Sequence, residues 1–215
     1  MILELPEDQL CELVYKQLNN LFFVNLSEHN QLAAALPDTL KRCDTCFAGN
    51  PAKYFQRDGE SYFNPYHSGQ YAIFLYYLSN TVFKQGNNLL ADRLYYLNKL
   101  LNACDLYHEI ELPDIFILDH PVGSVMGRAQ YGNYFAFSQN STVGNNKGIF
   151  PRIGEHATML SGTKILGDCE IGDYVTLAAN TYVKDTDIPA HSLVFGESPN
   201  LVIKENRVGI PAAAS

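Results

Sequence analysis

The stretch that decides the fold is RIGEHATMLSGTKILGDCEIGDYVTLAANTYV, from Arg152 to Val183. An apolar residue returns in it every six positions, at Ile153, Met159, Ile165, Ile171, Leu177 and Val183. A small or β-branched residue follows four positions after each of the first five, at Ala157, Thr163, Cys169, Val175 and Thr181. An α-helix repeats every 3.6 residues and a strand every two, so neither explains a period of six. The short strands of a parallel β-helix do, because three such units form one coil and the stacked coils bury the recurring apolar position.

The same period continues upstream of this stretch, through Val125, Tyr131, Phe137 and Val143. The step from Val143 to Ile153 is longer than six, which predicts an inserted loop within NNKGIFP, residues 145–151. We therefore expect a β-helical domain over residues 111–203 and a C-terminal tail over residues 204–215.

The first half of the chain has the pattern of helices. PEDQLCELVYKQLNNLFF (6–23) places Leu10, Val14, Leu18 and Leu21 three or four residues apart. Further helices are expected within PDTLKRC (37–43), NPYHSGQYAIFLYYLSNTVFKQG (64–86) and NNLLADRLYYLNKLLNACD (87–105), the last of them opened by an Asn cap. This predicts an α-helical domain over residues 1–110, whose aromatic residues from Tyr54 to Tyr96 form its core. The fold class is α+β, with helices first and the β-helix second.

Composition narrows the possible partners. The 215 residues carry a net charge of −8, and the 15 basic residues are scattered, whereas binding a nucleic acid begins with clustered Lys and Arg. The N-terminal stretch lacks the basic segment of a signal peptide, and no apolar run is long enough to span a membrane. We expect a cytoplasmic protein without a nucleic-acid or membrane partner. Five cysteines, an odd number, fit reduced thiols; the CxxC of Cys43 and Cys46 lacks the second pair that a zinc site needs.

A candidate general base lies in ILDHPVGSVMGRA, residues 117–129. Here His120 directly follows Asp119, and Asp105 precedes His120 by fifteen residues, close to one eighteen-residue coil. Histidine titrates nearest physiological pH, so its neutral form can accept a proton from a hydroxyl, and a carboxylate can orient it. Asp105 and His120 can therefore sit on adjacent coils.

These residues resemble the hexapeptide-repeat acyltransferases, and within them the serine acetyltransferases, from about residue 60 to residue 196. The resemblance rests on Asp105, on Leu118-Asp119-His120 with Gly123, on QNSTVG (139–144) and on LSGTKILG (160–167). It implies a left-handed β-helix and transfer of an acetyl group from acetyl-CoA to a small hydroxyl acceptor. It also implies a homotrimer or a dimer of trimers.

The resemblance assigns roles to individual residues. It implies His120 as the base and Asp105 as its partner. It implies Asp119 as an acceptor-binding residue, and Asp58 is the nearest candidate for a second family aspartate. Arg152 is a further acceptor-binding candidate, as one of the cations at the loop before it. It implies that acetyl-CoA is bound by Gly144, Ser161, Gly162, Ala179 and Lys164. No metal is expected, because His120 and His156 occupy different positions in their repeats.

The chain departs from the family at GNNKGIFPRIG, residues 144–154. This loop is shorter than in serine acetyltransferases, and Ile149 and Phe150 stand where the family has Arg-His before Pro. Because an Arg is the preferred partner of a carboxylate, the acceptor stays open between a serine-like molecule and a sugar or nucleotide-sugar hydroxyl or amine. A non-catalytic β-helix that serves assembly is the third possibility.

Overall fold

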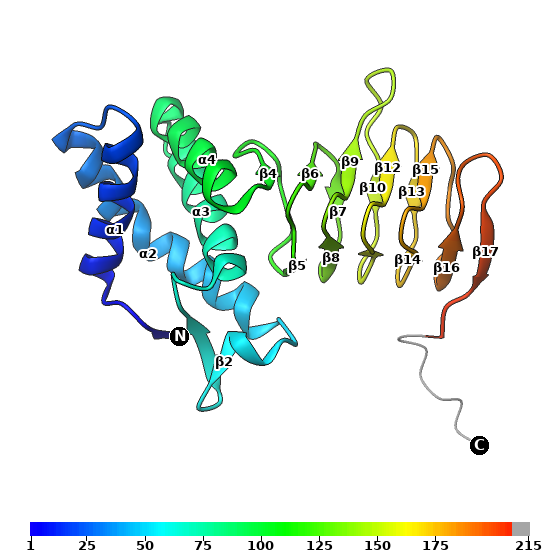
Figure 1. The fold of residues 1–215 in the computed structure, drawn as a ribbon, viewed down its shortest axis with the longest axis horizontal. Coiled ribbons are helices and arrows are strands. Elements are labelled where there is room, and N and C mark those ends of the chain that lie inside the picture. The colour runs from blue at the N-terminus through cyan, green and yellow to red at the C-terminus, as the bar shows by residue number, and fades with distance from the viewer. Residues whose placement is uncertain (208–215) are drawn as a thin grey trace. The chain divides into compact units, whose positions relative to one another are not determined.

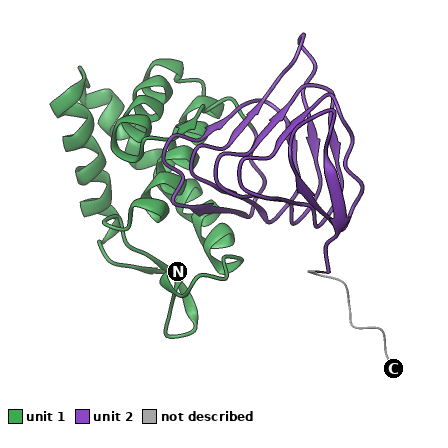
Figure 2. Cartoon of the chain, turned by 45° about the vertical axis from the view of Figure 1, so that its right-hand side comes forward, with its two compact units in different colours: residues 1–110 green, residues 111–215 purple. Residues whose placement is uncertain are grey.

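The structure, a computed structural model, describes residues 1–207. The chain divides into two compact units, Met1–Ile110 and Glu111–Ser215 (Figure 1 and Figure 2). The end of the expected tail, GIPAAAS, lies outside the described residues.

The first unit contains four α-helices and a small sheet. The helices are α1 (Glu7–Leu21), α2 (Leu26–Ala48), α3 (Ser68–Lys84) and α4 (Asn88–Asn102), with a 3-10 helix at Lys53–Phe55. The strands are β1 (Ile2–Leu3), β2 (Gln56–Arg57), β3 (Glu60–Phe63) and β4 (Asp105–Leu106), of which the first three form a sheet in the order β1-β3-β2. The predicted Asn cap is confirmed, since the Asn87 side chain accepts a hydrogen bond from the backbone N–H of Leu90.

Two details of the helices differ from the sequence prediction. PDTLKRC is not a separate helix but the middle of α2, which continues through Pro37. The capping box of Asn25 and Glu28 explains its earlier start, because each side chain accepts from the other residue's backbone N–H. Leu21, expected on the buried face of α1, is half exposed at the end of that helix.

Helix α3 supplies most of the core of the first unit. Nearly all of its residues are buried, because α2 and α4 both pack against it. The prediction of an aromatic core is confirmed for Tyr71, Phe74, Tyr76 and Tyr77, whereas Tyr54, Tyr66 and Tyr96 are exposed.

The second unit is a parallel β-helix of stacked coils, as the period of six predicts (Figure 1). One sheet stacks β5 (Phe116–Asp119), β8 (Phe135–Ser138), β11 (Thr158–Met159), β14 (Thr176–Leu177) and β16 (Ser192–Phe195). A second stacks β6 (Val125–Met126), β9 (Thr142–Gly144), β12 (Lys164–Leu166) and β15 (Tyr182–Lys184). A third stacks β7 (Gln130–Tyr131), β10 (Arg152–Ile153) and β13 (Glu170–Ile171). All six recurring apolar residues of the decisive stretch, and the five small ones between them, are buried.

The six-residue period predicted for the residues before Val143 is wrong at one position. Met126, not Val125, pairs with Val143 and is buried, while Val125 is exposed. The turn from Met126 to Tyr131 is one residue shorter than the six-residue repeat, so the inward position moves by one. A shift of one residue along a strand exchanges its two faces, which explains why Val125 points outward.

The last described strand, β17 (Val202–Glu205), pairs antiparallel with β16. It therefore crosses residue 203, where we expected the β-helical domain to end. No helix in residues 1–207 is long and apolar enough to cross a membrane.

Candidate functional site

His120 lies directly after β5, where the chain turns towards β6. Its backbone adopts a left-handed conformation with φ of 50°, and its side chain is 89% exposed. His120 Nε2 lies 3.9 Å from Asp119 Oδ1, and Asp119 Oδ2 accepts a hydrogen bond from the hydroxyl of buried Ser138 at 3.3 Å. The corner thus presents an accessible imidazole beside a carboxylate that is anchored on the next coil.

The turns of successive coils stack above one another at this corner. Backbone N–H groups of Asn140, Gly162 and Asn180 donate to carbonyls in the preceding coils, at 3.0, 2.9 and 2.8 Å. This stacking brings the turn after His120 into one column with the turns that contain Ser161 and Ala179. His120, for which the resemblance implies the role of base, therefore follows the same corner as Ser161, Gly162 and Ala179, for which it implies contact with acetyl-CoA.

A column of buried hydroxyl groups supports this corner from inside. Ser124 Oγ donates to the carbonyl of Ser138 at 2.7 Å and accepts from the N–H of Ser141 at 3.2 Å. The hydroxyls of Ser141 and Thr163 lie 3.2 Å apart, and Thr181 Oγ1 donates to a backbone carbonyl on the next coil. These bonds satisfy buried polar groups of the turns, which would otherwise be costly. The period marked Thr163 and Thr181 as inward positions, whereas the serines were not recognised.

The other residues assigned to acetyl-CoA lie along β9 and β12. The ammonium of Lys164, at the start of β12, donates to the carbonyl of Gly162 at 3.2 Å. Gly162 has a φ of 75°, so its backbone conformation already accounts for the glycine. Gly144 ends β9, and a Cβ there would meet only the side chain of Leu166, at 3.1 Å.

Arg152 lies on another face of the β-helix. It belongs to β10, and its guanidinium forms an exposed ion pair with Glu170 of β13 at 2.7 Å. The sheet that contains β6, β9, β12 and β15 separates β10 from the corner of His120 along the coil. With Gln130, Gly172 and neighbouring residues, this pair lines a cavity of about 380 Å³. The structure thus does not bring Arg152 and His120 together within one chain.

The predicted loop between β9 and β10 is confirmed and extends beyond the neighbouring turns (Figure 1). Asn146 and Ile149 exchange backbone hydrogen bonds of 3.1 and 3.0 Å across a tight turn. The Asn146 side chain donates to Asp185 at 2.5 Å and so ties the loop to the body of the β-helix. Ile149 and Phe150 remain exposed there.

Asp105 belongs to the first unit, where two side chains of α4 hold its carboxylate. Tyr95 Oη donates to Oδ1 at 2.9 Å and Lys99 Nζ donates to Oδ2 at 2.5 Å. Hydrogen bonding to Asp105 raises the pKa of Lys99, and burial together with the same carboxylate raises that of Tyr95. The sequence did not reveal these partners.

Asp58 occupies an exposed two-residue turn between β2 and β3. Both Asp58, with a φ of 53°, and Gly59, with a φ of 83°, are left-handed. Asp-Gly is a preferred pair for such hairpin turns, which accounts for an aspartate at this position.

His156 and His191, the other histidines of the β-helix, belong to a column of stacked rings. The rings of Tyr134, His156, Tyr174 and His191 stack nearly parallel, with centroids 4.4, 4.5 and 5.0 Å apart. Within residues 1–207, no group of three or more His, Cys, Asp or Glu side chains is arranged to hold a metal ion.

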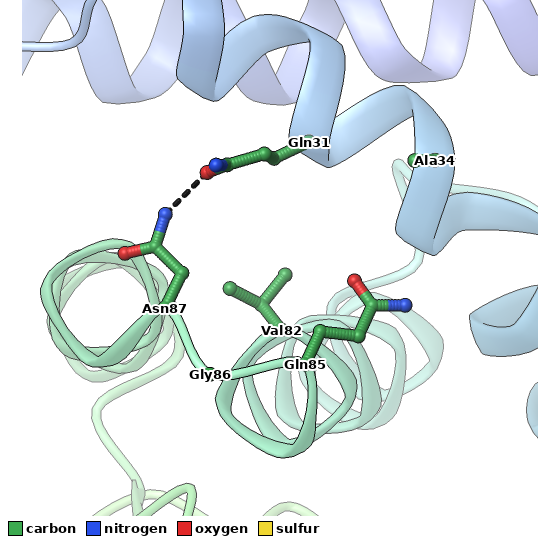
Figure 3. A pocket seen from close by; sticks show the side chains of 6 residues that line it. All are labelled: Gln31, Ala34, Val82, Gln85, Gly86 and Asn87. Atoms are coloured by element: carbon green, nitrogen blue, oxygen red, sulfur yellow. Dashed lines mark hydrogen bonds between the residues drawn. The ribbon is translucent and has the colours of Figure 1, made fainter.

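A cavity of about 310 Å³ lies in the helical unit, at the end of α3 and the start of α4 (Figure 3). Its lining residues are Gln31, Ala34, Val82, Gln85, Gly86 and Asn87. Two of these residues are joined by a hydrogen bond, which the Asn87 side chain donates to that of Gln31. None of the residues predicted for the functional site lines it.

Comparison with known proteins gives a consistent result. No family model matches the chain. The serine acetyltransferase of Bacillus subtilis (strain 168) is 26% identical over 171 residues, which cover 76% of each chain. A solved serine acetyltransferase in complex with cysteine has a TM-score of 0.71 at 20% identity, covering 91% of this chain and 84% of that one. A serine acetyltransferase in complex with CoA has a TM-score of 0.64 at 20% identity, covering 82% and 73%. In sequence and in fold, this chain is therefore similar to the serine acetyltransferases.

Proposed function

We propose that this chain is an acetyl-CoA-dependent O-acetyltransferase whose acceptor is the hydroxyl of serine or of a serine-like small molecule. The observation that supports this most is its similarity to the serine acetyltransferase of Bacillus subtilis over about three quarters of both chains. The accessible His120 on a β-helix corner is compatible with that chemistry.

In the proposed reaction, the imidazole of His120 acts as the general base. The acceptor oxygen attacks the thioester carbonyl carbon of acetyl-CoA while its proton passes to His120. The C–S bond then breaks, and the departing sulfur takes the proton from the imidazolium, so that the products are the acetyl ester and free CoA. We propose Asp105 as the carboxylate that orients His120, on the basis of the family resemblance and the fifteen-residue spacing.

For acetyl-CoA we propose the corner formed by Ser161, Gly162 and Ala179, together with Gly144. Small side chains leave room for the thin pantetheine arm to approach the backbone, and Ala179 is exposed. Lys164, exposed beside Gly162, is the candidate partner for the phosphates of the carrier.

For the acceptor we propose Asp119, Arg152 and Asp58. Asp119 is the best supported, because it adjoins His120 and is anchored by Ser138. Arg152 would have to contact the acceptor while it is paired with Glu170 or after it exchanges that partner.

A sugar or nucleotide-sugar acceptor is the second candidate. The exposed Ile149 and Phe150 favour it, because they offer apolar contact instead of a cation for a carboxylate. For the assembly, we propose a homotrimer or a dimer of trimers on the basis of the resemblance. Light scattering at micromolar concentration tests this state, and a monomer would contradict it.

The test of function is acceptor-dependent release of free thiol from acetyl-CoA. Purified protein is assayed with L-serine and with a panel of amino sugars and nucleotide sugars. We expect turnover with serine, and a loss of about 10²- to 10⁴-fold in the variant His120→Ala. His29→Ala, in α2 of the helical unit, is the control and should keep full activity. Release with sugars alone would select the second candidate, and full activity of His120→Ala would refute the proposed mechanism.

A further inference from the structure

The carboxylate of Asp105 is held from both sides by the last two turns of α4. Tyr95 donates to one oxygen and Lys99 to the other, and Lys99 also donates to Tyr95 Oη at 3.3 Å. The three side chains thus form a closed triangle. The Asp105 side chain is 23% exposed, so this triangle is partly shielded from water.

Local backbone structure explains why these groups meet. Helix α4 ends at Asn102, and Ala103 adopts a left-handed conformation with a φ of 50°. Its N–H donates to the carbonyl of Lys99, which ends the helix, and the following strand β4 packs against α4. A lysine in this turn also interacts favourably with the negative end of the helix dipole.

The ring of Tyr95 is fixed by its neighbours. It packs edge-on against Tyr107 with centroids 5.1 Å apart, and it lies 6.3 Å from the ring of His108. Its hydroxyl therefore points at Asp105 from a defined direction, whereas Lys99 supplies the charge.

We propose that Lys99 and Tyr95 are positioning residues that hold Asp105 in the orientation its catalytic role requires. This inference rests on the proposed function, in which Asp105 orients His120. Each carboxylate oxygen has two lone pairs, so a carboxylate that accepts one bond on each oxygen can still accept an imidazole N–H. The two donors prevent rotation of the carboxylate, and the ammonium stabilises its anionic form.

The experiment compares steady-state kinetics of three variants with the wild type. Lys99→Met removes the charge, Tyr95→Phe removes the hydroxyl, and Lys99→Arg retains a cationic donor. We expect Lys99→Met and Tyr95→Phe to lower kcat about tenfold with little change in KM, because a displaced catalytic group slows the reaction without weakening binding. Lys99→Arg should restore most of the rate.

Two control variants remove comparable groups elsewhere. Lys16→Met breaks the helix ion pair of Lys16 with Glu12, and Tyr96→Phe removes the neighbouring hydroxyl on α4. Both should keep the kcat of the wild type, and thermal unfolding should show that all variants are folded.

Two further readouts distinguish positioning from a merely structural role. In the background of Asp105→Asn, Lys99→Met should cause no additional loss, since the two groups act as one unit. The acid limb of the pH profile of kcat/KM should move to higher pH in Lys99→Met, because the Asp105 carboxylate then loses the ammonium that offsets its charge and, in its proposed role, favours the protonated base more strongly. Independent losses, or an unmoved acid limb, would overturn the assignment while the proposed function stands. If the wild-type protein shows no acceptor-dependent release of thiol, both the proposed function and the positioning role of Lys99 and Tyr95 are refuted.

Discussion

Close stacking of the coils makes a sharp prediction for Gly132, which follows β7. The neighbouring coil approaches it so closely that a Cβ built on Gly132 would lie 2.5 Å from both the nitrogen of Glu155 and the carbonyl carbon of Gly154. Ordinary Cβ contacts begin at 3.4 Å. Gly132→Ala therefore requires the two coils to separate by about 0.9 Å at this point.

That separation would break hydrogen bonds between the coils. The N–H of Gly132 donates to Ile153 at 2.8 Å, and the N–H of His156 donates to Asn133 at 2.9 Å. An opening of about 0.9 Å would stretch both beyond the range of a hydrogen bond. Two lost bonds at about 1 kcal/mol each, with residual overpacking, predict a destabilisation of about 2 to 4 kcal/mol. For a chain of this size the melting temperature should fall by roughly 4 to 16 °C.

Thermal unfolding followed by circular dichroism measures this effect. Gly148→Ala, in the loop after β9, is the matched control, because a Cβ there would have nothing within 4 Å. It should cost only about 1 kcal/mol, from the left-handed backbone at Gly148. If Gly132→Ala melts no lower than Gly148→Ala, the coils do not stack as tightly as described.

Three other outcomes are expected. Burial lowers the pKa of His108 below its ordinary value of 6.5, so the imidazole binds a proton more readily in the unfolded chain than in the folded one. The free energy of unfolding should therefore fall as the pH drops below 6.5. Urea unfolding at several pH values should show a smaller fall for His108→Phe than for the wild type, and an equal fall would contradict this explanation. All five cysteines are buried, and burial raises the pKa of Cys43. A thiol reagent should therefore react with the cysteines only after urea unfolds the protein. Rapid reaction of the native protein would contradict this expectation. The exposed pair of Arg152 and Glu170 should contribute little to the free energy of unfolding, because water and salt screen it. Arg152→Met should then leave the melting temperature nearly unchanged but raise the KM for serine if Arg152 binds the acceptor, whereas Glu170→Gln should not raise it.

Much of the second unit could be predicted because its period is local. Every inward position from Ile153 to Val183 is visible in the sequence, and each is buried. The prediction that Val125 is buried was wrong, because one turn is a residue shorter than the repeat and the inward position moves to Met126. Only the pairing of Met126 with Val143 reveals this shift. The sequence analysis also missed that α2 is one continuous helix, because it took Pro37 as the start of a helix, whereas the helix passes through it.

The sequence by itself determined the stacked-coil architecture of the second unit and the helical nature of the first. It did so because these features repeat at short intervals along the chain. Only the tertiary structure decided that Asp105 is held by Tyr95 and Lys99, that Asp119 is anchored by Ser138, and that Arg152 lies on another face. Such contacts depend on the direction of each side chain and on where each turn places it, and neither quantity has a period that a sequence can display.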